Sequence, residues 1–278
     1  MKISRFLAIT VAAILAASVL QAQQKSRVYG VDDPGARTLP NGSVGSFVND
    51  IKGEVSVSLT SKYVFRGVQR TNLAFQPAIT LEHKSGVYFN GFFNVPTSHA
   101  HDAEYDFNLG YNHELNKNLE LDGGIVLYLT PGFEDAAGQD LRKWTQEFYV
   151  GGKYKICPNF GARVYFYYDA RCEQLTSELA LGYSLKLSPS YSYMPANLNF
   201  SLYLGYSSGN DVLPDLAGPK VEDSYSYYGA SVEAPVRLTD KLSSNFGVQY
   251  GKSHNYMAGP LSDNSNHFWV FGSLSYNF

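Results

Sequence analysis

One short group of side chains in the sequence has the types and spacing to bind a transition metal. His99 and His101 are followed directly by Asp102, so two imidazoles and a carboxylate lie within four residues, and transition metals accept such ligands. A solvated loop is the simpler interpretation of the same segment. No local motif arranges a nucleophile, a base and a residue that orients the base, and no glycine-rich phosphate loop or Cys-x-x-Cys pair is present. We predict no enzyme activity, no cofactor and no metal site.

Charged side chains instead recur at alternate positions of segments whose other positions are apolar. In one such segment Leu119, Leu121 and Ile125 alternate with Glu120 and Asp122, the pattern of a strand with one apolar and one polar face. Buried charges without partners or water are costly, so the polar face lines either a wet lumen or a closed interior with cross-lumen ion pairs. The candidate lumen residues are Lys62, Arg66, Glu104, Asp106, Glu120, Asp122, Glu147, Arg163, Glu178, Lys186 and Glu233.

These residues must be positioned by strands, because no helical period competes with the period of two. Twelve segments carry it: 54–66, 74–82, 86–94, 103–113, 118–130, 143–155, 160–170, 175–187, 197–207, 223–236, 240–252 and 267–278. Their length suits tilted membrane strands, and an even number suits an outer-membrane barrel. Pro77 interrupts the second segment, which counts against a place in the middle of a strand. The prediction is an all-β fold, a single antiparallel transmembrane β-barrel of about twelve strands over residues 51–278.

The connections between these segments alternate in length, which is typical of short periplasmic turns and longer extracellular loops. Residues 83–85, 115–117, 156–159 and 238–240 make short connections, and residues 95–102, 131–142, 208–222 and 253–266 make long ones. Two connections depart from this rule. Connection 188–196 is long although it falls on the periplasmic side, and connection 171–174 is short although it falls on the extracellular side. The loop 208–222 is long enough either to fold inward or to meet a partner.

Composition supports a barrel and excludes other classes. The 278 residues include 22 Tyr, 17 Phe and 25 Gly, 17% are charged, and the net charge is −3. This mixture favours strands, and a chain without a basic tract is not expected to bind nucleic acid. Residues 1–22, with Lys2 and Arg5 before an apolar run that ends near Leu20, predict a signal peptide. Residues 23–50 predict a flexible periplasmic segment, with a role as a plug left open.

Aromatic residues on the apolar face predict two girdles at the membrane interfaces. The outer girdle is predicted from Tyr63, Phe65, Phe75, Trp144, Phe148, Tyr168, Tyr206 and Tyr250, and the periplasmic girdle from Tyr111, Tyr154, Tyr183 and Tyr276. A soluble sandwich would place aromatics at strand centres instead.

The two cysteines, Cys157 and Cys172, fall at opposite ends of one predicted strand. We predict no disulfide between them, because that separation far exceeds the reach of about 7 Å between Cα atoms.

One stretch carries a resemblance to a known family. Ser61, Tyr63, Arg66, Gly67 and Gln69 form a Ser-x-Tyr-x-x-Arg-Gly-x-Gln segment, followed by Pro77-Ala78 and by a strand that begins Gly86-Val87-Tyr88. In this the sequence resembles the TorF-type porins of Gram-negative outer membranes, specifically over residues 61–91 and only generically afterwards. The resemblance implies a pore-like outer-membrane protein and supplies no catalytic or ligand residues.

The sequence therefore predicts a porin-like channel of a Gram-negative outer membrane, for passive diffusion of small hydrophilic solutes or ions. The alternative is a closed structural or adhesive barrel that acts through its extracellular loops. The predicted partners are outer-membrane lipid and lipopolysaccharide, the transported solutes or ions, and the barrel-insertion machinery. The last predicted strand, which ends at Phe278, is the segment that this machinery is expected to recognise. Acidic residues outnumber basic ones among the candidate lumen residues, which indicates a weak preference for cations. Arg66 is expected either to pair with lumen or loop acids or to line the permeation path.

Overall fold

The computed structural model describes residues 50–98, 103–131, 137–139, 141–187, 194–256 and 264–278. The predicted signal peptide, nearly all of the segment 23–50 and the group from His99 to Asp102 lie outside these residues. No helix within the described ranges is long and apolar enough to cross a membrane.

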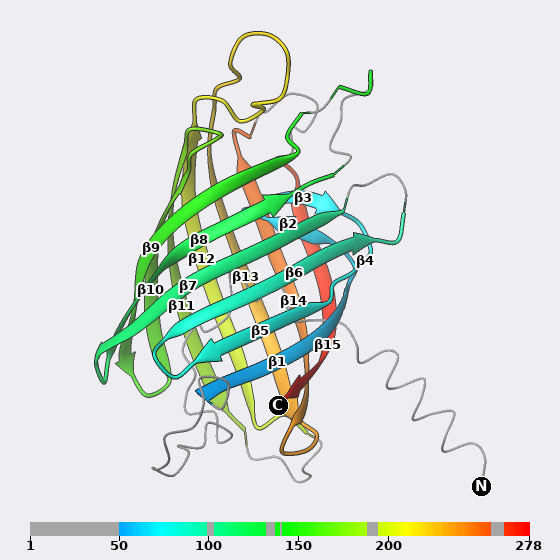
Figure 1. Ribbon diagram of the computed structural model, residues 1–278. Helices are drawn as coiled ribbons and strands as arrows, with labels where there is room; N and C mark the ends of the chain where they lie inside the picture. Colours follow the sequence, from blue (N-terminus) through cyan, green and yellow to red (C-terminus); the bar gives the residue numbers. More distant parts are fainter. Residues whose placement is uncertain (1–49, 99–102, 132–136, 140, 188–193, 257–263) are drawn as a thin grey trace, which may run out of the picture.

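The strands form one closed antiparallel barrel (Figure 1). Its wall consists of β1 (Ile51–Thr60), β4 (Ala74–Phe75), β5 (Ala78–His83), β6 (Val87–Pro96), β7 (Glu104–Asn116), β8 (Leu119–Leu129), β9 (Trp144–Cys157), β10 (Phe160–Asp169), β11 (Gln174–Lys186), β12 (Asn197–Gly209), β13 (Asp223–Arg237), β14 (Leu242–His254) and β15 (Asn266–Asn277). The barrel closes where β1 pairs with β15, for example Val55 with Tyr276. The predicted twelve-stranded antiparallel barrel is confirmed.

Strands β4 and β5 together occupy one position in the wall, because both pair with β1 on one side and with β6 on the other. The break falls at Gln76 and Pro77, where the sequence predicts an interruption. The side chain of Gln76 turns into the barrel, where its amide nitrogen donates to Asn94 Oδ1 at 2.9 Å. Proline lacks the N–H that a continuous ladder would need at this point.

The barrel has two distinct ends. At the turn end the strands are joined by short connections such as 117–118 and 158–159, and both Ile51 and Asn277 lie there. At the loop end the connections include 210–222 and 170–173. Cys157 lies at the turn end and Cys172 at the loop end, and neither forms a disulfide.

The wall buries polar residues and exposes apolar ones, the reverse of a soluble protein. On β1, Ser56, Ser58 and Thr60 are buried inside the barrel, while Val55 and Leu59 are exposed on its outer surface. The same alternation is clear along β10, β11 and β13. A continuous apolar exterior of this kind marks a membrane-facing surface.

The short strands β2 (Tyr63–Phe65) and β3 (Val68–Thr71) form a hairpin that leaves the wall after β1 and lies inside the barrel. Arg66 and Gly67, between the two strands, have φ values of 49° and 78°. Positive φ at both central residues is the signature of a type I′ hairpin turn. Gly67 also lies against the backbone of β14, where a Cβ would come 2.6 Å from the carbonyl group of Lys252.

This hairpin corrects the prediction that the first strand continues from residue 54 to 66. The strand ends at Thr60, and the alternation in residues 61–66 belongs to the internal hairpin. Tyr63 is buried against Phe92 and so does not belong to the outer aromatic girdle, and neither does Phe65. An alternation with period two is expected of any extended segment with two different faces, and this hairpin packs against the inner wall and borders the lumen cavities instead of facing lipid.

The connection 210–222 folds inward over the hairpin. Val212 and Leu213 are buried there in a cluster with Val68 of the hairpin, which we call the loop-end cluster. Its other buried members are Leu141, Tyr225, Tyr227 and Tyr256. The length of this loop allowed it either to fold inward or to meet a partner, and in the structure it folds inward.

Candidate functional site

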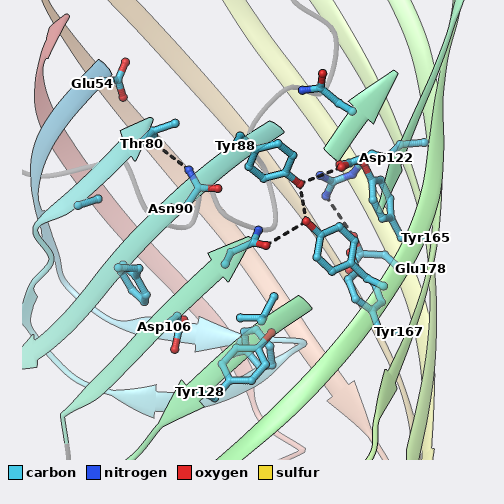
Figure 2. A pocket seen from close by; sticks show the side chains of 18 of the residues that line it. Glu54, Thr80, Tyr88, Asn90, Asp106, Asp122, Tyr128, Tyr165, Tyr167 and Glu178 are labelled. Atoms are coloured by element: carbon cyan, nitrogen blue, oxygen red, sulfur yellow. Dashed lines mark hydrogen bonds and ion pairs between the residues drawn. The ribbon is translucent and has the colours of Figure 1, made fainter. Parts of the chain in front are cut away.

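The lumen holds a cavity of about 470 Å³ that extends from the turn end of the barrel to the hairpin (Figure 2). Its lining begins with Lys52 and Asn277 near the turn end and reaches Arg66 at the tip of the hairpin. A second cavity of about 40 Å³ lies beyond the hairpin, toward the loop-end cluster. Phe65, Arg66 and Tyr128 border both cavities, so the hairpin separates them.

Tyrosine hydroxyls and amides line one side of the large cavity in a continuous hydrogen-bonded chain (Figure 2). Tyr88 donates to Asp122 Oδ1 at 2.8 Å, and Tyr165 donates to Asp122 Oδ2 at 2.6 Å. Tyr149 contacts the Tyr88 hydroxyl and donates to Asn108 Oδ1 at 3.0 Å. These rings come from three wall strands, β6, β9 and β10, and they hold one carboxylate in a fixed orientation.

Glycines on the inner face make room for these rings. A Cβ on Gly151 would lie 2.4 Å from the ring of Tyr165, and a Cβ on Gly205 would lie 2.2 Å from the ring of Tyr227. Each glycine is the direct cross-strand partner of the tyrosine that covers it. The ring therefore lies flat against the wall instead of filling the lumen.

A buried bidentate ion pair anchors the hairpin to the wall. Arg66 Nη1 and Nη2 donate to the two carboxylate oxygens of Glu147 on β9, at 2.7 and 2.9 Å. Tyr128 donates to the same carboxylate at 3.1 Å. The guanidinium also lies over the ring of Tyr167, 4.7 Å from its centroid. Close to the hairpin's first strand, Tyr63 donates to Glu104 Oε1 at 2.6 Å.

Two further clusters pair Arg163 and Lys153 with acids of the wall. Arg163 on β10 donates to Glu178 Oε1 at 3.0 Å, and Lys153 on β9 lies 2.6 Å from Glu120 Oε1 and 3.7 Å from Asp122 Oδ2. Arg163 and Lys153 therefore neutralise acids on the neighbouring strands, which lowers the cost of holding these charges inside the barrel.

Among the described residues that border the large cavity, Asp106 and Gln249 have unpartnered side-chain atoms, as do Arg66 and Arg163 at Nε. Asp106 on β7 is 3% exposed, and its Oδ1 atom has no hydrogen-bond partner. Gln249 on β14 is also buried, and both polar atoms of its amide are unpartnered. Both side chains border the large cavity. Polar groups in this condition require water or a solute in the cavity.

The candidate lumen residues divide into three sets. Arg66, Asp106, Asp122, Arg163 and Glu178 border the large cavity, Glu104 and Glu147 border the small one with Arg66, and Glu120 lies beside Lys153. Glu120, Lys62, Lys186 and Glu233 border neither cavity. Lys62 is half-buried at the start of the hairpin, Lys186 is exposed at the turn end of β11, and Glu233 accepts a hydrogen bond from Asn245 at 3.1 Å.

Sequence reasoning missed Lys153, Gln249 and the lumen tyrosines. Lys153 lies on the polar face of its strand, so the alternation of the sequence could have identified it. The tyrosines could have been identified only by a weaker pattern, the glycines at opposing positions of the polar face.

The charged residues that border the large cavity are the acids Glu54, Glu82, Asp106, Asp122 and Glu178 and the bases Lys52, Arg66, Lys153 and Arg163. Acids exceed bases by one.

No group of three or more His, Cys, Asp or Glu side chains is placed to hold a metal ion within the described part of the chain.

Outside the strands, burial raises the pKa of the Cys172 thiol to about 11, an effect that the nearby Arg142 guanidinium opposes. A thiol with so high a pKa remains protonated at neutral pH and is a poor nucleophile. The charges and hydroxyls of the lumen are suited to bind and orient polar solutes.

Residues 51–207, more than half of the chain, match the model of the Gcw_chp family, which is described as a bacterial protein of unknown function. No curated protein matches the sequence.

Among solved structures, the chain is similar to the KdgM porin in complex with disordered oligogalacturonate, with a TM-score of 0.50 and 7% identity over 82% of this chain and 99% of that one. It also matches the NanC porin, with a TM-score of 0.48 and 10% identity over 81% of this chain and 98% of that one. The COG4313 outer membrane channel from Pseudomonas putida F1 matches with a TM-score of 0.45 and 14% identity over 82% of this chain and 95% of that one. The similarity to KdgM shows the fold of an outer-membrane β-barrel channel, the fold that the predicted location requires.

Proposed function

We propose that this chain, which belongs to the Gcw_chp family of bacterial proteins, forms a narrow channel in the outer membrane of a Gram-negative bacterium for passive diffusion of small hydrophilic solutes or ions. The observation that carries the proposal is the polar cavity of about 470 Å³ inside a closed barrel whose outer surface is apolar. Residues 1–22 serve as its export signal and residues 23–50 as a periplasmic segment.

The direction of insertion follows from the two ends of the barrel. Porins of this architecture keep short turns and both termini in the periplasm, so the large cavity opens toward the periplasm and the hairpin lies on the extracellular side. The last residue, Phe278, pairs through its backbone with Gly53 at distances of 2.9 and 3.1 Å. The final strand is therefore part of the closing seam, and it is the segment that we propose the insertion machinery recognises.

The hairpin sets the width of the path. A solute that leaves the large cavity toward the loop end must pass the boundary formed by Phe65, Arg66 and Tyr128. Beyond it lie the small cavity and the loop-end cluster. The channel is consequently selective for small solutes, and a displacement of the hairpin would widen it.

A closed barrel with a structural or adhesive role is the second candidate. The buried cluster of Val68, Val212 and Leu213 favours it, because an apolar contact between the hairpin and loop 210–222 holds the loop end together. In this function the lumen charges would serve only to stabilise the barrel.

Single-channel recording in a planar bilayer tests the two functions against each other. The refolded protein, with its folded state verified by heat-dependent migration on a gel, is expected to give small discrete current steps. In a salt gradient the reversal potential is expected to indicate cation preference. Folded protein that gives no current would refute the channel and favour the closed barrel.

A pair of variants connects the current to the lumen. Asp122→Asn removes a charge that borders the large cavity, while Asp240→Asn removes one from an exposed turn. The first substitution is expected to shift the reversal potential toward anions and the second to leave it unchanged. Equal shifts would mean that the lumen acids do not set the selectivity.

A further inference from the structure

Asp106 is a buried carboxylate of the lumen that takes part in none of the ion pairs described above. It is 3% exposed, borders the large cavity, and its Oδ1 atom has no hydrogen-bond partner among the described residues. Tyr63 donates to Glu104, and Arg66 is bound to Glu147. Burying a carboxylate without a donor is unfavourable, so this position gains stability when a donor enters the cavity.

The direct neighbours of Asp106 on the wall are aromatic. Phe92 on β6 and Tyr128 on β8 are its cross-strand partners, and both border the same cavity. Figure 2 shows Asp106 and Tyr128 close together. Tyr128 is held in place by its hydrogen bond to Glu147, and the ring of Phe92 packs edge-on against Tyr63 at a centroid distance of 5.8 Å. A carboxylate flanked by two immobilised aromatic rings offers both charge and ring faces to a cation.

The charged groups around Asp106 carry a small excess of negative charge. Glu104 and Glu147 act electrostatically on Asp106, and Arg66 is bound to Glu147 through both of its terminal nitrogens. Arg70, Arg142 and Asp169 border the small cavity with Glu104, Glu147 and Arg66. Asp106, Glu104, Glu147 and Asp169 are four acids against the three bases Arg66, Arg70 and Arg142, so acids exceed bases by one in this part of the lumen. A carboxylated solute is repelled there, and a cation is attracted.

We propose that Asp106, Phe92 and Tyr128 form a binding subsite for the ammonium group of a small organic cation, at the point where the hairpin narrows the lumen. This subsite rests on the proposed channel function, because the cation reaches it through the large cavity. The flanking groups are aromatic carbons rather than further oxygen ligands, which suits an organic ammonium group better than a hard metal ion.

Isothermal titration of the folded barrel in detergent with choline tests the proposal. The neutral isostere 3,3-dimethylbutan-1-ol has the same shape without the charge. We expect the wild-type protein to bind choline and not the isostere. No heat of binding with choline, or equal binding of the two compounds, would overturn the proposal.

Variants then assign the binding to the subsite. Asp106→Asn, which keeps the side-chain shape, is expected to weaken choline binding about tenfold or more, because it removes the ionic partner from a desolvated site. Glu114→Gln removes one charge from the exposed turn end of the same strand and is expected to leave binding unchanged. Phe92→Leu provides a second variant that tests the aromatic contribution. Unchanged affinity in Asp106→Asn would refute the subsite.

The titration does not depend on current, so its result separates the two proposals. Choline binding by a barrel that is silent in the bilayer would refute the channel and retain the subsite. Current through a barrel that does not bind choline would retain the channel and refute the subsite.

Discussion

Replacing Arg66 with alanine should release the internal hairpin from the wall. In the native protein the side chains of Arg66 and Glu147 are each 3% exposed and share two hydrogen bonds. Removing one partner of a buried ion pair typically costs about 3–5 kcal/mol, because the remaining charge stays buried without compensation. Here Glu147 would retain one donor, Tyr128, which places the expected cost near the lower end of that range.

This cost falls on the docked state of the hairpin and not on the wall, because the strands of the wall keep their ladders. Each 1.4 kcal/mol is a factor of about ten in an equilibrium constant, so about 3 kcal/mol raises the undocked population of the hairpin about a hundredfold. Hydrogen exchange followed by mass spectrometry is the direct assay. Residues 63–71 should lose protection by about that factor, while β12 keeps its protection.

The double variant Arg66→Met with Glu147→Gln is the matched control. It leaves no unpaired charge, and such replacements of buried ion pairs are often close to neutral. Its hairpin should exchange at nearly the native rate. Native protection of residues 63–71 in Arg66→Ala would refute the anchoring role of the ion pair. An equal loss of protection in β12 would show that the ion pair stabilises the whole barrel instead.

Three further predictions concern packing, hydrogen bonding and thiol chemistry. Gly205→Ala should lower the free energy of unfolding in urea by about 1–3 kcal/mol, because its Cβ would overlap a tyrosine ring 2.2 Å away, whereas Gly152→Ala meets only ordinary contacts of 3.5 Å or more. Tyr63→Phe should destabilise by about 1.5–3 kcal/mol, since it removes the buried hydroxyl that donates to a carboxylate, and hydrogen exchange of the hairpin should locate the loss. Iodoacetamide at pH 8 should modify the exposed Cys157 and spare Cys172, whose pKa burial raises to about 11.

Each of these predictions has an outcome that contradicts it. Equal stability losses in Gly205→Ala and Gly152→Ala would mean that the tyrosine ring has room to move. Native hydrogen exchange in Tyr63→Phe would show that its hydroxyl does not help to hold the hairpin. Equal alkylation rates for Cys157 and Cys172 in the folded protein, measured by peptide mass spectrometry, would mean that the loop around Cys172 opens readily. After denaturation both thiols should react, which verifies the assay.

The barrel could be predicted because one physical constraint acts on nearly every wall residue. Lipid outside and a polar lumen inside force alternation, as in Leu119, Leu121, Glu120 and Asp122, and the number of alternating segments then gives the number of strands. The hairpin was missed because its residues also alternate. Arg66 is the last residue of the first predicted segment, and nothing local indicates that the chain then enters the barrel.

The lumen was predicted in part for a related reason. A charged side chain facing lipid is costly, so strand parity assigned Asp122, Arg163 and Glu178 to the interior. Parity gives the face of a residue but not its height along the barrel, and for this reason Lys186 and Glu233 were grouped with residues that border the cavities. Tyrosines suit both the membrane interface and a polar lumen, so their position in this barrel follows from three-dimensional packing.

The anchored hairpin also bears on the order in which the chain assembles. The seam of the barrel joins positions as far apart in the chain as Ser61 and Val270, a separation of 209 residues, while Arg66 and Glu147 are only 81 residues apart. Loop-closure entropy makes the shorter connection less costly by about 0.8 kcal/mol. Contact between the hairpin and β9 is thus favoured before the ends of the chain meet, and it holds β1 near a curved half-barrel. The docked hairpin thereby keeps β1 in position until β15 pairs with it and closes the barrel.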